Sequence, residues 1–178
     1  MHYLYFVRVP KEKAETSKEA RTSVENILES EGFAGEGGYF SSSKSDWFVI
    51  GGRWSGELQR LLMKKDFFEV VKDKYKSHKG MSVYGMSSDL VKKEKDNLQK
   101  IWEEIGGKHL NPYNRDTYNQ EGYEDDAIII TKELLKALKK KAYNETEVFD
   151  TEHCDEYLVK DLDKDSIGSW LVVVDYHN

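Results

Sequence analysis

The residues best suited to chemistry lie in one short segment with the sequence DWFVIGGRWSG. Gly51 and Gly52 follow an aromatic and β-branched run typical of a buried strand, and glycines let backbone N–H groups approach a ligand closely. Arg53 adds a guanidinium that suits carboxylate or phosphate groups, and Trp54 or Trp47 could stack on a flat ligand. The order strand, Gly-Gly, Arg-Trp, helix predicts an anion-binding turn.

A structural interpretation of the same segment competes with this one. Gly-Gly-x-Trp can be a tight turn whose tryptophan closes the core, with Arg53 paired to a surface carboxylate. Neither the G-x-G-x-x-G pattern nor a P-loop is present. Spacing alone therefore favours the structural interpretation.

A second candidate feature is the D-x-H pair formed by Asp175 and His177. Residues two apart on a strand point to the same face. The pair could therefore ligate a metal, or the aspartate could orient a catalytic histidine. Two ligands are too few for a metal site, and Asp46, Asp125 or Asp126 are candidates to complete it. An ordinary strand that leaves its sheet in polar residues is the structural alternative.

The adjacent acids Asp125 and Asp126 are a third feature, because they precede a run typical of a buried strand. Such a pair could bind Mg²⁺, cap a turn or lie in solvent. A solvated position is the default expectation for both side chains.

The chain has 178 residues, a formal net charge of −6 and a single cysteine, Cys154. The length suits one domain, and the negative charge argues against nucleic acid as a partner. One cysteine allows neither an internal disulfide nor a cysteine-based zinc site, and its acidic neighbours disfavour a reactive thiolate. No apolar run approaches the ~18 residues of a membrane span, so we expect no membrane partner and a cytoplasmic location.

Hydrophobic periodicity predicts short strands and several amphipathic helices. The strand segments are rich in aromatic and β-branched residues: His2–Val9, Tyr39–Phe40, Trp47–Ile50, Ala127–Ile130, Glu147–Phe149, Tyr157–Val159 and Trp170–Val174. Helices are expected after the capping-box pattern at Thr16, from Glu57 to Tyr75 with a break at Lys64-Lys65-Asp66, from Leu90 to Ile105, and after Thr131.

These elements predict an α+β fold in a single domain over residues 1–178. We expect a mainly antiparallel sheet of four or five strands with helices on one face. The leading plan is a ferredoxin-like βαββαβ arrangement with a helical insertion between residues 58 and 107.

The DWFVIGGRWSG segment, the Asp125-Asp126-Ala127 run and the closing VVVDYHN sequence together resemble a family of uncharacterised proteins encoded by bacteria and their phages. Members of that family carry a D-W-[FY]-x-I-G-G-R-W-x-G core and a V-V-D-x-H C-terminus. The matching positions here are Asp46, Trp47, Phe48, Ile50, Gly51, Gly52, Arg53, Trp54, Gly56, Asp175 and His177. Many relatives have a cysteine where this chain has Tyr176, and the middle region from Leu61 to Gly122 is not matched.

The resemblance implies no established activity, but it implies that the two polar segments belong together. Arg53 and Trp54 should then meet Asp175 and His177 in space, with the first and last strands as neighbours in one sheet. This implication shifts the balance toward a functional site.

Two alternative functions are therefore expected. The first is a binding or hydrolytic site for a small anionic, nucleotide-like ligand, in which His177 is an acid–base group or metal ligand oriented by Asp175. Its ligand-binding residues would be Gly51, Gly52, Arg53, Trp54, Trp47 and Asp46, and its candidate metal ligands Asp175, His177, Asp125 and Asp126. The second is a phage-type protein-interaction module that inhibits a host enzyme through an acidic surface. The sequence identifies no cofactor.

Overall fold

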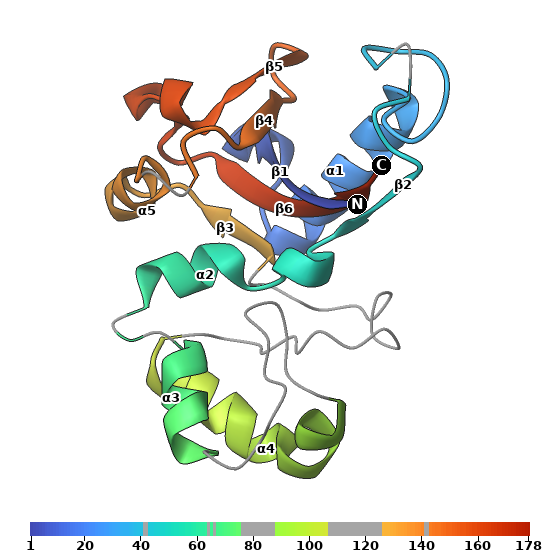
Figure 1. Ribbon diagram of the computed structural model, residues 1–178. Helices are drawn as coiled ribbons and strands as arrows, with labels where there is room; N and C mark the ends of the chain where they lie inside the picture. Colours follow the sequence, from blue (N-terminus) through green and yellow to red (C-terminus); the bar gives the residue numbers. More distant parts are fainter. Residues whose placement is uncertain (41–42, 64, 66, 76–87, 107–125, 141–142) are drawn as a thin grey trace.

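The computed structural model describes the chain except residues 41–42, 64, 66, 76–87, 107–125 and 141–142 (Figure 1). The described part has an α+β fold, as predicted. Its sheet contains six strands: β1 (His2–Val9), β2 (Trp47–Ile50), β3 (Ala127–Ile129), β4 (Glu147–Asp150), β5 (Asp155–Leu158) and β6 (Trp170–His177). The prediction of a strand at Tyr39–Phe40 is wrong, because these residues pair with no strand of the described sheet.

The sheet is centred on β6, which runs antiparallel to β1 over eight residue pairs, from His177 opposite His2 to Trp170 opposite Val9. On its other side, β6 pairs first with β2 and then with β3 (Figure 1). β4 pairs with β1 in parallel, and β5 forms the edge beyond it. The described sheet is therefore mixed, and it has six strands rather than the expected four or five.

The helices of the described part are α1 (Ser17–Ser30), α2 (Glu57–Leu62), α3 (Phe67–Lys74), α4 (Ser88–Glu104) and α5 (Lys132–Leu138). α1 begins where the capping box predicts, since Thr16 Oγ1 accepts a hydrogen bond from Glu19 N at 3.2 Å. The helical stretch from Glu57 to Tyr75 breaks in two as expected, and Met63 leaves the helical conformation with ψ of 146°.

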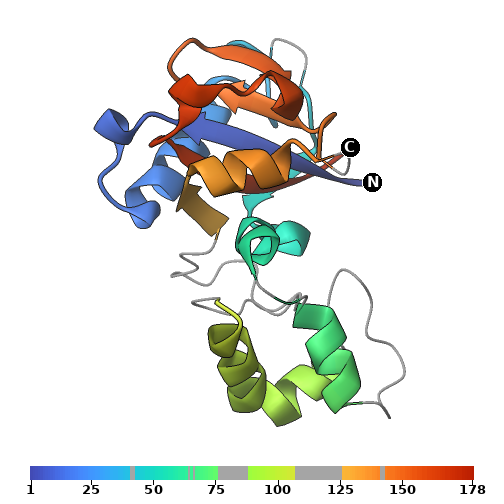
Figure 2. The ribbon, with the colours of Figure 1, turned by 90° about the vertical axis from the view of Figure 1, so that its left-hand side faces the viewer.

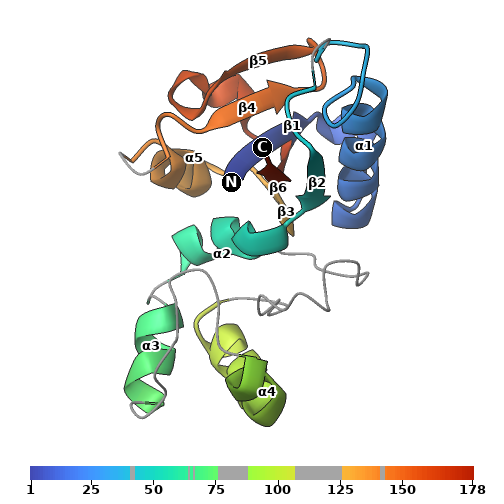
Figure 3. The same cartoon turned by 45° about the vertical axis from the view of Figure 1, so that its right-hand side comes forward.

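Helices cover both faces of the sheet, which corrects the expectation of one covered face (Figure 3). On one face, Val24 and Leu28 of α1 are fully buried against β1 and β6. On the other, Leu58 of α2 and Leu134 of α5 are fully buried against the same two strands. The reason lies in β6, where Leu171 to Val174 form an unbroken apolar run that needs cover on both sides.

The segment between β2 and β3 contains the expected helical insertion. Its helices α3 and α4 pack on each other below α2 (Figures 1 and 2), around a cluster of their own. That cluster consists of Phe67, Val71, Leu98, Ile101 and Trp102. Trp102 also reaches the start of α2, because a Cβ placed on Gly56 would lie 3.0 Å from its ring.

The chain order begins as the ferredoxin-like plan does, with β1, α1, β2, the helical insertion, β3, α5 and β4. β2 and β3 do not pair with each other in the described sheet, however; each pairs with a different part of β6. β5 and β6 follow as additional strands. The last strand therefore enters between β2 and β1, and it makes the pair β1–β6 the centre of the sheet.

The packing of α1 gives a first prediction. Leu28→Ala should lower the free energy of unfolding by about 2–5 kcal/mol, because it leaves a cavity at a fully buried position. Leu62→Ala is the matched control, with a smaller expected loss because its side chain is 37% exposed. Urea unfolding of both variants measures the difference, and equal losses would contradict the packing described for α1.

Candidate functional site

The ends of three neighbouring strands, β1, β6 and β2, lie close together (Figure 3), and they carry aromatic and acidic residues. In the register of the sheet, His177 on β6 lies opposite His2 on β1 and opposite Trp47 on β2. The ring centroid of His177 lies 5.3 Å from that of His2 and 5.8 Å from that of Trp47, whose ring is parallel to it. We call these three side chains, together with Asp46 and Asp175, the histidine cluster.

Asp175 is the buried member of the cluster, with no exposed surface. Its Oδ1 lies 2.9 Å from His2 Nδ1, and its Oδ2 accepts a hydrogen bond from Arg53 N at 2.8 Å. The carboxylate thus connects β6 to β1 and to the turn that follows β2. The expected meeting of Arg53 with Asp175 is confirmed, and it is made by the backbone of Arg53.

The pairing of acids with histidines differs from the expected one. Asp175 contacts His2, whereas His177 Nδ1 lies 3.1 Å from Oδ2 of the exposed Asp46. His177 Nε2 lies 3.0 Å from Met1 N, so both of its ring nitrogens have partners. The sheet geometry explains the difference, because His2 is the diagonal neighbour of Asp175 on the adjacent strand, within reach of its carboxylate.

Two glycines allow the turn after β2 to lie against two buried carboxylates. Gly51 and Gly52 have φ values of 78° and 54°. A Cβ on Gly51 would overlap the carboxylate of Asp126, and a Cβ on Gly52 would lie 2.5 Å from Oδ2 of Asp175. A side chain at either position would therefore meet both backbone strain and a buried acid.

Asp126 is fully buried, so the expectation that it is solvated is wrong. Its Oδ1 accepts hydrogen bonds from Ser55 Oγ at 2.6 Å and from Gly56 N at 3.2 Å. Asp126 therefore anchors the turn that leads into α2, which is the capping role left open by the sequence. Asp125 lies outside the described residues.

Several backbone amides of the turn donate hydrogen bonds within the protein. Gly51 N donates to Val173 O at 2.8 Å, which continues the β2–β6 pairing, and Arg53 N donates to Asp175. This corrects the expectation that the Gly51 amide holds an anion.

The two tryptophans occupy different environments. Trp54 is half-buried and packs against the apolar cluster that contains Leu58, as the structural interpretation of the turn expects. Trp47 is 38% exposed, and its ring lies edge-on to His2 and parallel to His177. Trp47 is therefore the better stacking surface for a ligand.

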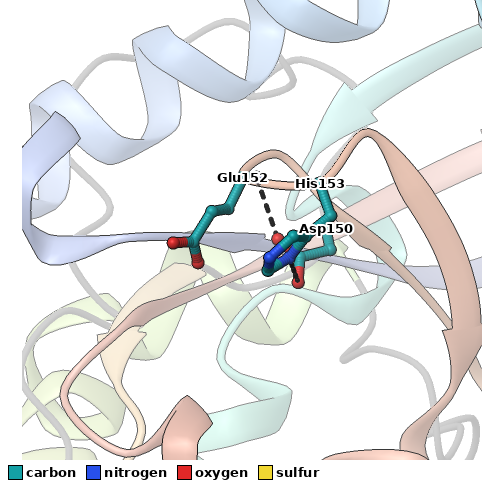
Figure 4. Close-up of side chains that lie close together, drawn as sticks. All are labelled: Asp150, Glu152 and His153. Carbon is teal, nitrogen blue, oxygen red and sulfur yellow. Dashed lines mark hydrogen bonds and ion pairs between the residues drawn. The ribbon is translucent and has the colours of Figure 1, made fainter.

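The candidate metal ligands do not gather into one site in the described part of the chain. Asp175 and Asp126 hold different parts of the turn, and His177 faces Asp46. A different trio has potential ligand atoms within 4.8 Å of one another. It consists of Asp150, Glu152 and His153 at the turn between β4 and β5 (Figure 4).

This trio lines a cavity of about 770 Å³, near the end of β1 that lies away from the histidine cluster. Its described lining carries far more acidic than basic side chains, so we call it the acidic cavity. The acids are Glu12, Asp150, Glu152, Asp161, Asp163 and Asp165, and the bases are Arg8 and Lys11. A surface of this charge favours cationic partners.

Arg8 occupies the space between two of these acids. It is 8% exposed, and its Nη1 lies 2.8 Å from Asp150 Oδ2 and 2.9 Å from Glu152 Oε2. Its Nε donates to Ser169 Oγ at 3.1 Å. Because the protein supplies its own cation between Asp150 and Glu152, the group is best explained as an ion-pair network around the buried Asp150 rather than a metal site.

The electrostatics of the network favour the charged forms. Burial raises the pKa of Asp150, but the N–H of Glu152, the ring of His153 and the charge of Arg8 lower it by more, so its pKa lies below the ordinary value. Burial lowers the pKa of Arg8, but the hydrogen bond to Glu152 and the charge of Asp150 raise it by more. The pair therefore links β1 to β4 electrostatically at neutral pH.

The sequence contains a signal for this network that lies outside the three candidate motifs. Arg8 stands in the run HYLYFVRV, which otherwise suits a buried strand. A cation in such a run needs a buried acid as its partner. The parallel pairing of β1 with β4 supplies one, since Arg8 lies directly opposite Asp150 in the register.

Comparison with known proteins gave no match to any family model, curated protein or solved structure. Among the described residues, no helix is both long enough and apolar enough to cross a membrane.

The glycine turn gives a second prediction. Gly52→Ala should lower the free energy of unfolding by about 2 kcal/mol or more, because φ of 54° is strained for alanine and the new Cβ meets Asp175. Gly35→Ala is the matched control, since a Cβ there meets nothing within 4 Å, and we expect a change within about 0.5 kcal/mol. Urea midpoints compare the two, and a neutral Gly52→Ala would contradict the described turn.

The ion-pair network gives a third prediction. Arg8→Met should lower the free energy of unfolding by about 3–5 kcal/mol at pH 7, because it leaves Asp150 buried without its cation. The exposed pair Lys160–Glu145 supplies the control, and Lys160→Met should cost no more than about 1 kcal/mol.

The pH dependence of the same pair has a definite sign. The pKa of Asp150 is lowered in the folded protein, so its contribution is complete above the unfolded value of about 3.9 and is lost as the pH falls through the lowered one. Without Arg8 the folded-state pKa of Asp150 lies higher than in the wild type, so the stability difference between wild type and Arg8→Met should be smaller at pH 3 than at pH 7. A constant difference from pH 7 to pH 3 would show that the Arg8 charge is not the cause.

Proposed function

We propose that the histidine cluster, together with the Arg53 side chain, forms a binding or hydrolytic site for a small anionic, nucleotide-like ligand. One observation carries this proposal: His2, His177 and Trp47 stand in a row across three strands, beside the turn that carries Arg53. Aromatic, basic and acid–base groups are thus adjacent, which is what an anionic ligand with a flat ring requires.

Each part of the site has a distinct role in this proposal. Trp47 offers its exposed ring to a base or a similar flat group. Arg53 offers a guanidinium to a phosphate or carboxylate. His177, with a side chain 36% exposed, lies between Trp47 and His2 and completes the binding surface with Asp46.

The alternative is a protein-interaction module of the phage type that inhibits a host enzyme. The acidic cavity supports it, because an excess of carboxylates at one end of the sheet would attract a basic partner surface. That function needs no ligand at the histidine cluster, so the two proposals give different expectations for Arg53 variants.

The fourth prediction tests ligand binding by thermal melting with ATP, ADP and AMP, each with and without Mg²⁺. A nucleotide at 100 times its Kd should add about 2.7 kcal/mol of stability, and each kcal/mol raises the Tm by about 2–4 °C at this chain length. Arg53→Ala should abolish the shift. The variant should still fold, because the hydrogen bond to Asp175 comes from the backbone of residue 53.

Arg21→Ala on α1 is the matched control and should keep the full shift. A shift that survives Arg53→Ala would overturn the role of Arg53. No shift in the well-folded wild type would overturn the ligand site, and stoichiometric capture of a host enzyme that is lost on charge reversal of Asp161 and Asp163 would then support the alternative.

A further inference from the structure

The contact between His2 and Asp175 differs from the other histidine–acid contacts in the described part of the chain. Asp175 has no exposed surface and is held on its second oxygen by Arg53 N, so its position is fixed. Asp46 is exposed where it meets His177, and His153 is itself 69% exposed where it meets Asp150. The buried acid therefore orients His2 and not His177.

The hydrogen bond also fixes which nitrogen of His2 is available for chemistry. An ionised aspartate accepts hydrogen bonds only, so Nδ1 of His2 must carry the proton that Asp175 accepts. The lone pair of the neutral imidazole is then on Nε2. The His2 side chain is 16% exposed, whereas Asp175 has no exposed surface.

The surroundings of His2 suit a phosphate ester. The centroid of its ring lies 5.3 Å from that of His177 and 5.2 Å from that of Trp47, with both contacts edge-on. The backbone N of Arg53 donates a hydrogen bond to Asp175, the carboxylate that also contacts His2. Because the rings of His2 and Trp47 are adjacent, a nucleotide whose base stacks on Trp47 would have its phosphate within reach of His2 and of the turn that carries Arg53.

His177 is less suited to act as the base. Its Nδ1 faces Asp46, and its Nε2 lies 3.0 Å from Met1 N, so neither nitrogen offers an unshared lone pair to a substrate. Its place beside His2 fits a contribution to binding.

We propose that His2 is the catalytic base of a phosphate-ester hydrolase and that Asp175 is its positioning residue; this rests on the proposed nucleotide-like ligand. His2 Nε2 takes a proton from a water molecule while the water oxygen forms a bond to phosphorus. The bond from phosphorus to the leaving oxygen breaks with its electron pair. The proton on Nε2 then passes to that oxygen, so the products are a phosphate and an alcohol or shorter nucleotide.

The experiment is steady-state kinetics of the purified full chain with ATP, AMP, p-nitrophenyl phosphate and bis-p-nitrophenyl phosphate. Release of phosphate or nitrophenolate is measured. His2→Gln should lower kcat at least about 100-fold, the usual minimum for loss of a general base. His153→Gln, at the other end of the sheet, is the matched control and should leave kcat unchanged.

Asp175→Asn separates positioning from folding. The asparagine oxygen can still accept from Arg53 N, but its NH₂ group would face His2 Nδ1 and favour the wrong tautomer. We expect kcat to fall about 100-fold or more with KM and Tm nearly unchanged. A change in KM alone, or a collapse of Tm with His2→Gln still fully active, would overturn the assignment.

The outcomes distinguish this inference from the proposed function. Nucleotides that shift the Tm of wild type but release no product would overturn the hydrolase and leave the binding site standing. Activity that survives His2→Gln would overturn His2 as the base. If no nucleotide shifted the Tm and none of the four compounds gave product, both the ligand site and the hydrolase would be overturned.

Discussion

The antiparallel ladder between β1 and β6 is the interaction on which the rest of this structure depends. Both strands are apolar on their two faces, so each side of the ladder must be covered, by α1 on one side and by α2 and α5 on the other. β2 and β3 attach to the free side of β6, and β4 attaches to the free side of β1. The two candidate regions lie at opposite ends of this ladder, with His2 beside His177 at one end and Arg8 near the other.

Buried carboxylates impose the second constraint. Asp126, Asp150 and Asp175 are almost completely buried, and a buried acid without a partner would cost several kcal/mol. Each is satisfied in its own way: Asp126 by a hydroxyl and a backbone amide, Asp150 by Arg8 and the backbone amide of Glu152, and Asp175 by His2 and a backbone amide. The conformation of the turn after β2 follows from this requirement, because two of the three acids need its backbone close to them.

Much of the local structure could be predicted from the sequence, and the partners of polar side chains could not. Strand β1 and the start of α1 follow from alternation and from the capping box at Thr16. The unbroken apolar run in β6 indicates two covered faces, although the order of the elements led us to expect one. The D-x-H spacing correctly places Asp175 and His177 on one strand, yet spacing within a strand says nothing about which neighbour a carboxylate reaches. The partners of Asp175 and Arg8 depend on sheet register between distant segments, which periodicity does not encode.

The position of β6 has a consequence for how this protein folds during synthesis. The strand at the centre of the sheet leaves the ribosome after all the other described strands, long after its main partner β1. Until β6 emerges, β1 and the apolar stripe of α1 lack the strand that completes their burial. Their hydrophobic side chains therefore stay partly exposed while the residues between α1 and β6 are synthesised. A ribosome that stalls before residue 170 would therefore release a chain without its sheet centre, a substrate for chaperones and proteases rather than a slightly shortened domain.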